Sequence, residues 1–324
     1  PVTFTTYFEY SSGDTGGLAT TAQAGDWSNA NTWTNGNIPL AGDEVEINHD
    51  VTLDQDATVS SLNINTGITF TVDTGHTLTS NGGGITGAGN YIVNGTWTIE
   101  SGGFTNIAPT YGSSSTLTYG DGQTYGRSTE WRANSGAGYP NNIIIQNNTT
   151  LNLGANGGTG TARQISGNLT VESGSTLSLN IDSMTAALTV LGDFTNNGTV
   201  TLSNSVGGDL VLEGNFDDNG TFNANGRAVF FEGGSTQNIN STSDPLEIDV
   251  MRIDKSGGEV VMDQNLEVTK TGDPLIFSNN KSFLNLNGNN LTIGEDGTTS
   301  SITYNNGGAF RGTSNSSMTI EGHG

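Results

Sequence analysis

The chain has 324 residues, and 32 acidic residues against 9 basic ones give a formal net charge of −23, which repels nucleic acid and anionic lipid. Cysteine is absent, which excludes a disulfide scaffold, thiolate metal sites and a cysteine nucleophile. No run of apolar residues approaches the roughly 18 that a membrane span needs, so we expect no membrane insertion. Because of the negative charge, we also expect no nucleic-acid binding.

The N-terminal region, residues 1–50, precedes the regular part of the sequence. Val2 to Tyr10 alternates threonine with apolar residues and predicts a strand, and the small, glycine-rich residues that follow predict a linker up to residue 24. Trp27 and Trp33 then lie in a segment, about 25–50, that we expect to cap a stack of coils, because the first coil of such a stack has an exposed core. A sugar-binding aromatic platform is the alternative.

Short strands separated by turn residues fill the sequence from Val45 to Glu100, and no segment shows a convincing 3.6-residue period, so we expect essentially no helix. The metal content is unknown from sequence, and no other cofactor is expected. The Asp-x-Asx-x-Asx-Gly calcium loop is absent, which leaves as weak candidates for Ca²⁺ the aspartates Asp43, Asp50, Asp54 and Asp56. No zinc-binding spacing links the histidines His49, His76 and His323.

Residues 101–140 interrupt the regular succession of short strands and turns, and they contain the stretch richest in aromatic residues. We expect an aromatic excursion here, which either leaves the coils or joins two runs of them. An aromatic face with a charged, hydrogen-bonding rim suits saccharide binding, so the candidate ligand-binding residues are Tyr125, Arg127, Glu130, Trp131, Arg132 and Tyr139. In the alternative interpretation the segment is packed, with Arg127 paired to Glu130 and Trp131 covering the core.

The stretch from Leu188 to Ala224 contains the same pattern twice. Phe194 recurs 22 residues later as Phe216, and an Asn-Gly corner follows each of them. Apolar residues alternate within each copy, as in a strand with one buried face, and the corners supply residues that tolerate positive φ. A fixed period near 20 residues marks a stacked solenoid. The sequence therefore predicts an all-β fold, a right-handed parallel β-helix (β-solenoid) over residues 25–324.

Strand-like segments continue to Met318–Ile320, where the sequence stops in mid-pattern. An open last coil would leave apolar residues and strand edges bare. We therefore expect a piece of a longer protein, or an end that docks on a partner, with a homo-oligomer or filament among the outcomes.

Three blocks of the sequence have a familiar form. The opening block is Gly25 to Trp33 with Pro39, Gly42-Asp43 and Val51 to Asp54, and the others lie within Ser115 to Ile145 and Ile302 to Gly322. All three resemble β-helical repeat regions of very large cell-surface proteins of Bacteroidota. The opening block also resembles a G8-type module, whose members include proteins linked to extracellular polysaccharide. The resemblance implies an adhesin, used in gliding or attachment, that the type 9 secretion system exports to the cell surface. Its implied partners are that secretion machinery and extracellular surfaces or polysaccharide.

One short motif suggests a modification. Asp182-Ser183-Met184 fits the pattern on which Bacteroidota attach O-glycans, which makes Ser183 the candidate glycosylation site. The C-terminal sorting domain that such exported proteins carry is not recognisable in this sequence, a departure that agrees with a piece of a longer protein.

Catalysis is the main alternative, because parallel β-helices are common among polysaccharide lyases and glycoside hydrolases. A lyase needs a base and a charge neutraliser, and a glycosidase needs two carboxylates across a cleft. Asp217 and Asp218 fall at a corner of the repeat, and Lys255 lies in a corner-like Asp-Lys-Ser-Gly-Gly that predicts a solvated surface. We expect no catalytic residues and no enzyme activity.

Ice binding is a third hypothesis, since β-helices with threonine ladders can perform it, but no regular Thr-x-Thr is recognised at one coil position. The sequence thus favours a non-enzymatic structural and adhesive module outside the cell. A carbohydrate-active β-helix enzyme and an ice-binding or filament-forming protein are the alternatives.

Overall fold

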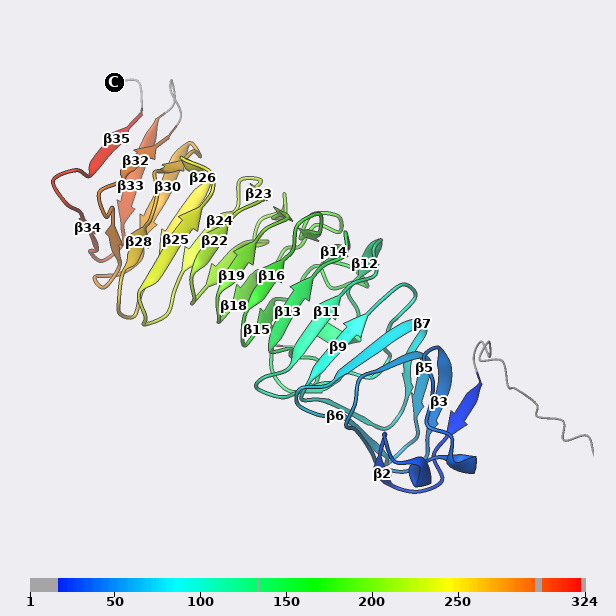
Figure 1. Ribbon diagram of the computed structural model, residues 1–324. Coiled ribbons are helices and arrows are strands. Elements are labelled where there is room, and N and C mark those ends of the chain that lie inside the picture. The colour runs from blue at the N-terminus through cyan, green and yellow to red at the C-terminus, as the bar shows by residue number, and fades with distance from the viewer. Residues whose placement is uncertain (1–16, 133, 295–298, 322–324) are drawn as a thin grey trace, which may run out of the picture.

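The computed structural model describes residues 17–132, 134–294 and 299–321, which form one elongated stack of coils (Figure 1). Neighbouring strands within each sheet pair in parallel. The helical segments of these described residues are three short 3₁₀ helices, η1 (Ala30–Thr32), η2 (Thr34–Gly36) and η3 (Thr129–Trp131). The predicted all-β fold, a parallel β-solenoid, is confirmed.

One sheet, the main sheet, runs the whole length of the stack (Figure 1). Its fourteen strands, in order of contact, are β1 (Leu18–Thr20), β3 (Asp43–Ile47), β5 (Ala57–Ile64), β7 (Thr77–Gly87), β9 (Thr96–Ile99), β11 (Thr116–Tyr119), β13 (Asn142–Ile145), β16 (Leu169–Val171), β19 (Phe194–Asn196), β22 (Phe216–Asp218), β25 (Gln237–Ser241), β28 (Val260–Met262), β31 (Phe283–Asn285) and β34 (Ala309–Arg311). Because neighbouring strands lie about 4.8 Å apart, equivalent side chains of successive coils stack on one another.

The other faces of the coils change along the rod. The N-terminal coils add a sheet of β2 (Gly25–Asp26), β4 (Val51–Leu53), β6 (Thr69–Val72), β8 (Asn90–Val93) and β10 (Thr110–Tyr111). The middle coils add a sheet of β12 (Thr124–Gly126), β14 (Thr150–Asn152), β17 (Thr176–Ser178), β20 (Thr199–Thr201) and β23 (Thr221–Asn223).

Two further sheets complete the middle and C-terminal coils. The longer one contains β15 (Arg163–Ile165), β18 (Leu188–Val190), β21 (Leu210–Leu212), β24 (Ala228–Phe231), β27 (Val250–Ile253), β30 (Gly272–Phe277) and β33 (Ser300–Tyr304). The shorter one contains β26 (Leu246–Ile248), β29 (Leu266–Val268), β32 (Asn290–Ile293) and β35 (Ser317–Ile320).

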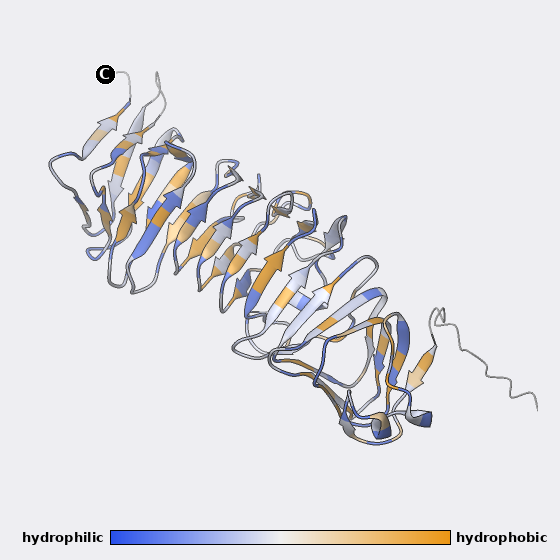
Figure 2. Cartoon of the chain, in the orientation of Figure 1, coloured by the Kyte–Doolittle hydropathy of each residue, from blue (hydrophilic) through white to orange (hydrophobic). Residues whose placement is uncertain are grey.

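The duplicated pattern stacks in register, as its period predicts. Phe194 of β19 lies beside Phe216 of β22, with ring centroids 5.4 Å apart and an interplanar angle of 12°. Along β18, Leu188 and Val190 are buried and Thr189 between them is half-buried. Figure 2 shows this alternation of apolar and polar residues along the strands of the rod. A narrow apolar core therefore runs through the stack.

The Asn-Gly corners of the duplicated pattern do not use left-handed backbone, so that prediction is wrong. Neither Gly198 nor Gly220 is among the residues with positive φ. A Cβ at Gly198 would lie 2.3 Å from the Ser175 carbonyl oxygen, and one at Gly220 would lie 2.2 Å from that of Gly198. Glycine is needed here because successive coils approach too closely for a side chain.

Amide and carboxylate side chains fasten one coil to the next at the start of the main-sheet strands. In each case Oδ1 accepts a hydrogen bond of 2.8 to 2.9 Å from the backbone N–H of the equivalent residue one coil later. The four acceptors of this Asn/Asp ladder are Asn142, Asn168, Asp193 and Asn215, and Asn238 supplies the last backbone N–H. The ladder satisfies backbone donors that a corner would otherwise leave unpaired.

Two tryptophans close the N-terminal end of the core. Trp27 is fully buried and Trp33 is 2% exposed, and their rings meet edge to face with centroids 4.8 Å apart. Nε1 of Trp33 donates to the Trp27 carbonyl oxygen at 2.7 Å. Of the predicted N-terminal strand and linker, residues 1–16 lie outside the described residues. Leu18–Thr20 is the first strand of the main sheet, so the coils begin before residue 25.

The aromatic segment, residues 101–140, joins two runs of coils. It contributes β11 to the main sheet, between β9 and β13. Within the same segment one face ends with β10 and the next begins with β12. Of the two alternatives that the sequence leaves open for this segment, the structure has the join, because the cross-section changes here while the main sheet continues.

Candidate functional site

The predicted ligand-binding residues lie mostly inside this join. Four of them are no more than 9% exposed: Tyr125, Arg127, Glu130 and Trp131. The other two are Arg132, which is exposed, and Tyr139, which is half-buried. The buried four present no aromatic face to a sugar, so this set does not form an open binding surface in the structure.

Arg127 is held in the core by backbone carbonyls. Its Nε donates to Leu153 O at 2.9 Å, and its Nη2 donates to Ala155 O at 2.8 Å. Its Nη1 donates to the carbonyl oxygens of Ser128 and Trp131, at 2.8 and 3.0 Å. Four hydrogen bonds to carbonyls replace the ion pair with Glu130 that the packed interpretation expects.

Glu130 places a carboxyl group in the core of the join. Its Oε1 accepts hydrogen bonds from the Ser128 N–H at 2.7 Å and from the Tyr119 hydroxyl at 3.2 Å. Burial raises the pKa of Glu130, and the hydrogen bonds and Arg127 oppose that rise. Since the group is enclosed on all sides, it serves the packing of the join rather than contact with a substrate.

The four aspartates considered for calcium cap backbone donors. Each accepts a hydrogen bond from a backbone N–H through its Oδ1: Asp43, Asp50, Asp54 and Asp56. Among the described residues, no three histidine, cysteine, aspartate or glutamate side chains are grouped to hold a metal ion. His323 lies outside the described residues, and calcium binding stays a prediction.

Ser183, the candidate glycosylation site, is half-buried at a corner of the rod. Its hydroxyl donates to Asn204 Oδ1 at 2.9 Å. The neighbouring Asp182 is exposed and accepts a hydrogen bond from Asn152 Nδ2 at 2.8 Å. Glycosylation stays a prediction for this residue.

Two charged residues that the sequence places at corners are buried. Asp218 is 2% exposed and accepts a hydrogen bond from Asn196 Nδ2 at 2.6 Å. Lys255 is fully buried, so the prediction of a solvated lysine is wrong. One sequence signal points to the burial of Asp218. The equivalent residue of the preceding copy is the uncharged Asn196.

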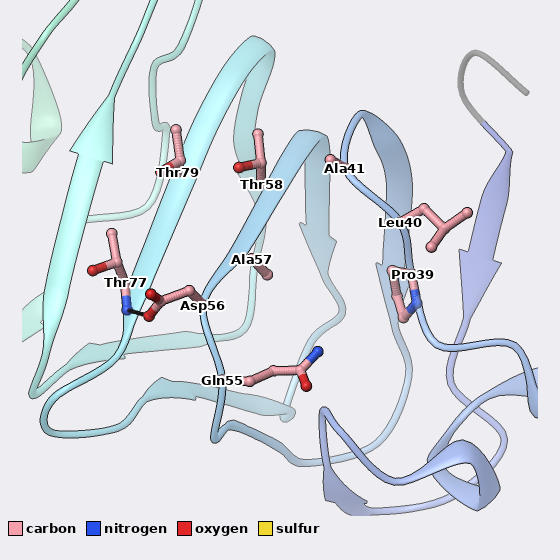
Figure 3. A pocket seen from close by; sticks show the side chains of 9 residues that line it. All are labelled: Pro39, Leu40, Ala41, Gln55, Asp56, Ala57, Thr58, Thr77 and Thr79. Atoms are coloured by element: carbon pink, nitrogen blue, oxygen red, sulfur yellow. Dashed lines mark hydrogen bonds between the residues drawn. The ribbon is translucent and has the colours of Figure 1, made fainter. Parts of the chain in front are cut away.

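A shallow hollow of about 420 Å³ lies near the N-terminal end of the rod (Figure 3). The loop of residues 39–41 forms one side, and residues 55–58 with Thr77 and Thr79 form the other. Asp56 Oδ1 accepts a hydrogen bond from the Thr77 N–H at 2.8 Å. The lining thus combines hydroxyl, amide and carboxylate groups with apolar Pro39 and Leu40, around a volume that suits a small ligand or part of a polymer.

The hollow adjoins three stacked Thr-x-Thr segments, residues 77–79 of β7, 96–98 of β9 and 116–118 of β11. We call these six threonines the threonine rows. Five of them are half-buried and Thr118 is 4% exposed. Strand geometry places neighbouring positions about 4.8 Å apart across the strands and about 6.7 Å along them. The expectation that no Thr-x-Thr recurs at one coil position is wrong.

No family model matches the sequence, and no curated protein or solved structure matches it significantly. Within the described part of the chain, no helix is long and apolar enough to cross a membrane. The class that fold and site define is a parallel β-solenoid with a hydroxyl-lined hollow near one end.

Proposed function

We propose that the chain is a non-enzymatic structural and adhesive rod that works at the cell surface and binds neutral polysaccharide through the hollow and the threonine rows. The observation that carries this proposal is the main sheet, whose fourteen parallel strands extend one narrow core along the molecule. Such a stack holds a surface at a distance without moving parts. The net charge of −23 opposes anionic chains, which favours an uncharged polymer.

The placement of the acidic residues supports binding rather than turnover. A glycosidase needs two carboxyl groups that face each other across a cleft. Among the residues that line the hollow, Asp56 alone carries a carboxylate, and that group caps a backbone N–H. Sugar hydroxyls find hydrogen-bonding partners in Gln55 and the threonines, while Leu40, 66% exposed, offers apolar contact.

The resemblance to Bacteroidota surface proteins adds an export route and a setting. In this proposal the type 9 secretion system delivers the rod, and the rod spaces or displays binding surfaces of a larger adhesin.

Affinity electrophoresis tests the proposal. We expect native gels that contain xyloglucan or hydroxyethyl cellulose to retard the protein, and gels that contain dextran sulfate to leave it unretarded. Thr79→Val and Thr98→Val remove hydroxyls of the threonine rows and should weaken retardation several-fold. Thr170→Val, on β16 of the same sheet, is the matched control and should change nothing. Unretarded migration of the wild type in every neutral gel would contradict the proposal.

The threonine rows favour ice binding as a second candidate. Hydroxyls at regular spacing on a rigid sheet can order water in a lattice that resembles the arrangement of oxygen atoms in ice. We expect the wild type to be enriched in slowly grown ice and to facet the crystals, and Thr98→Tyr to abolish both effects. Round, unfaceted crystals and exclusion of the wild type from ice would reject this candidate.

A further inference from the structure

The C-terminal half of the rod buries a lysine amine against a glutamine side chain. Lys255 and Gln237 are both fully buried. Nζ of Lys255 donates to Gln237 Oε1 and to the Glu232 carbonyl oxygen, each at 2.5 Å. Nε2 of Gln237 donates in turn to Leu212 O at 3.0 Å and to Gly214 O at 2.6 Å. Backbone carbonyls therefore hold the amine and the carboxamide in contact.

The surroundings of the amine favour its uncharged form. Burial lowers the pKa of Lys255 to about 8, and Glu213 acts in the opposite direction. Within the described residues, the two ion pairs link His76 with Asp56 and Arg311 with Glu259, so no carboxylate is paired with Lys255. A useful fraction of the amine is thus neutral near neutral pH, and a neutral amine is a nucleophile.

We propose that Lys255 and Gln237 form an intramolecular isopeptide bond. The Lys255 Nζ attacks Cδ of Gln237, the Nζ–Cδ bond forms, and the Cδ–Nε2 bond breaks. One proton passes from Nζ to Nε2, which leaves as ammonia, so the step needs no oxidant or cofactor. Contact in a site without bulk water supplies the proximity that is worth about 10⁵ to 10⁸ M of effective concentration in well-oriented reactions.

The product would lock one coil of the rod. Gln237 begins β25, and Lys255 lies at the corner between β27 and β28. A bond between them closes a covalent ring through residues 237–255, so that coil could not be pulled open from either end. Such a ring suits a molecule that bears load, but its formation does not depend on which surface the rod binds.

Mass spectrometry of the purified wild-type chain tests the bond. We expect a denatured mass lower than the sequence mass by one ammonia. Trypsin does not cut after an acylated lysine, so the digest should contain peptide 228–252 joined through Gln237 to peptide 253–270. The peptide map is decisive, because cyclisation at an Asn-Gly sequence also releases ammonia but joins no peptides. Separate peptides with a cut after Lys255 would overturn the proposal.

Variants and pH sharpen the same test. Lys255→Met and Gln237→Met should lack the joined peptides. Lys270→Met, which removes an amine that donates to Gly226 O on the surface, should keep the joint. Because this variant also loses the tryptic cut after residue 270, its joined partner is peptide 253–281. If the first two variants fail to fold, the wild-type peptide map still decides. Joining should accelerate about tenfold per pH unit below pH 8, as the neutral amine becomes more abundant. A rate that does not change with pH would contradict the amine mechanism.

Discussion

The two ends of the rod cover their apolar residues differently. At the N-terminal end Trp27 and Trp33 are 0% and 2% exposed, whereas Met318 and Ile320 of β35 are 44% and 49% exposed. A strand inside the stack has a coil on each side, while β35 pairs, among the described residues, with β32 alone. Burial in this fold therefore comes from neighbouring coils. Where a coil lacks a second neighbour, large side chains must fold over its core, or the core stays partly exposed.

Removal of the tryptophan cap should have the largest effect on stability. Trp27→Ala deletes a fully buried ring that packs on Trp33 and Phe70, and we expect it to cost about 3 to 5 kcal/mol of unfolding free energy. Urea unfolding followed by tryptophan fluorescence and circular dichroism measures the loss. Leu40→Ala, at a residue 66% exposed near the same end, is the control and should stay within about 0.5 kcal/mol. Equal losses would refute the role of the cap.

A matched pair of methionines tests the contribution of the second neighbour. Met262 of β28 lies inside the stack and is fully buried, whereas Met318 lies in β35. We expect Met262→Ala to cost about 2 to 5 kcal/mol and Met318→Ala to cost less than about 1 kcal/mol, by the same unfolding assay. Similar costs at the two positions would mean that the open coil is as well packed as the interior.

The Asn/Asp ladder should contribute in smaller steps. Asp193 Oδ1 accepts a hydrogen bond from the Asn215 N–H at 2.8 Å, so Asp193→Ala leaves that donor unpaired and should cost about 1 kcal/mol. Asp193→Asn keeps an acceptor at the same place and should cost almost nothing. Thermal unfolding of the two variants gives the difference. If Asn and Ala were equally damaging, the charge and not the hydrogen bond would matter.

The smallest expected effect is a gain from a buried carboxylate. Burial raises the pKa of Asp218, and the hydrogen bonds from Asn196 and Gly220 oppose that rise. Because the folded pKa lies above the unfolded one, the contribution of this group is full below the unfolded pKa and is lost as the pH rises through the folded pKa. Asp218→Asn should therefore stabilise the protein by about 0.5 to 1 kcal/mol at pH 7 and by almost nothing at pH 3. A loss at pH 7 would show that the charge is needed.

The course of the main sheet could be predicted because it follows from local repetition. Phe194 and Phe216 recur at a fixed offset with alternating apolar neighbours. A fixed offset places equivalent residues beside each other when one coil stacks on the next. The corners were harder to predict. Asn-Gly pairs suggest a turn, but the close approach of Gly220 to Gly198 depends on how tightly successive coils are wound, which is a property of the assembled stack.

Only part of the candidate site could be predicted from the sequence. The threonine rows could not be predicted from a fixed period, because the spacing between Thr77, Thr96 and Thr116 changes by one residue. Their alignment depends on the conformation of the corners between the strands. Arg127 and Trp131 were candidates for a binding face because an aromatic face with a charged, hydrogen-bonding rim suits saccharide binding. Where the cross-section changes at the join, the same side chains fill the core, and backbone carbonyls accept the hydrogen bonds of the guanidinium.

The most direct test of a rod that works by surface contact and not by turnover is one chromatographic time course. The intact protein is incubated with soluble xyloglucan, and samples are run on a size-exclusion column with light-scattering detection. We predict that the protein elutes with the polymer and that the molar mass of the polymer stays constant over days. A polymer that shortens with time while the protein elutes free would contradict the account.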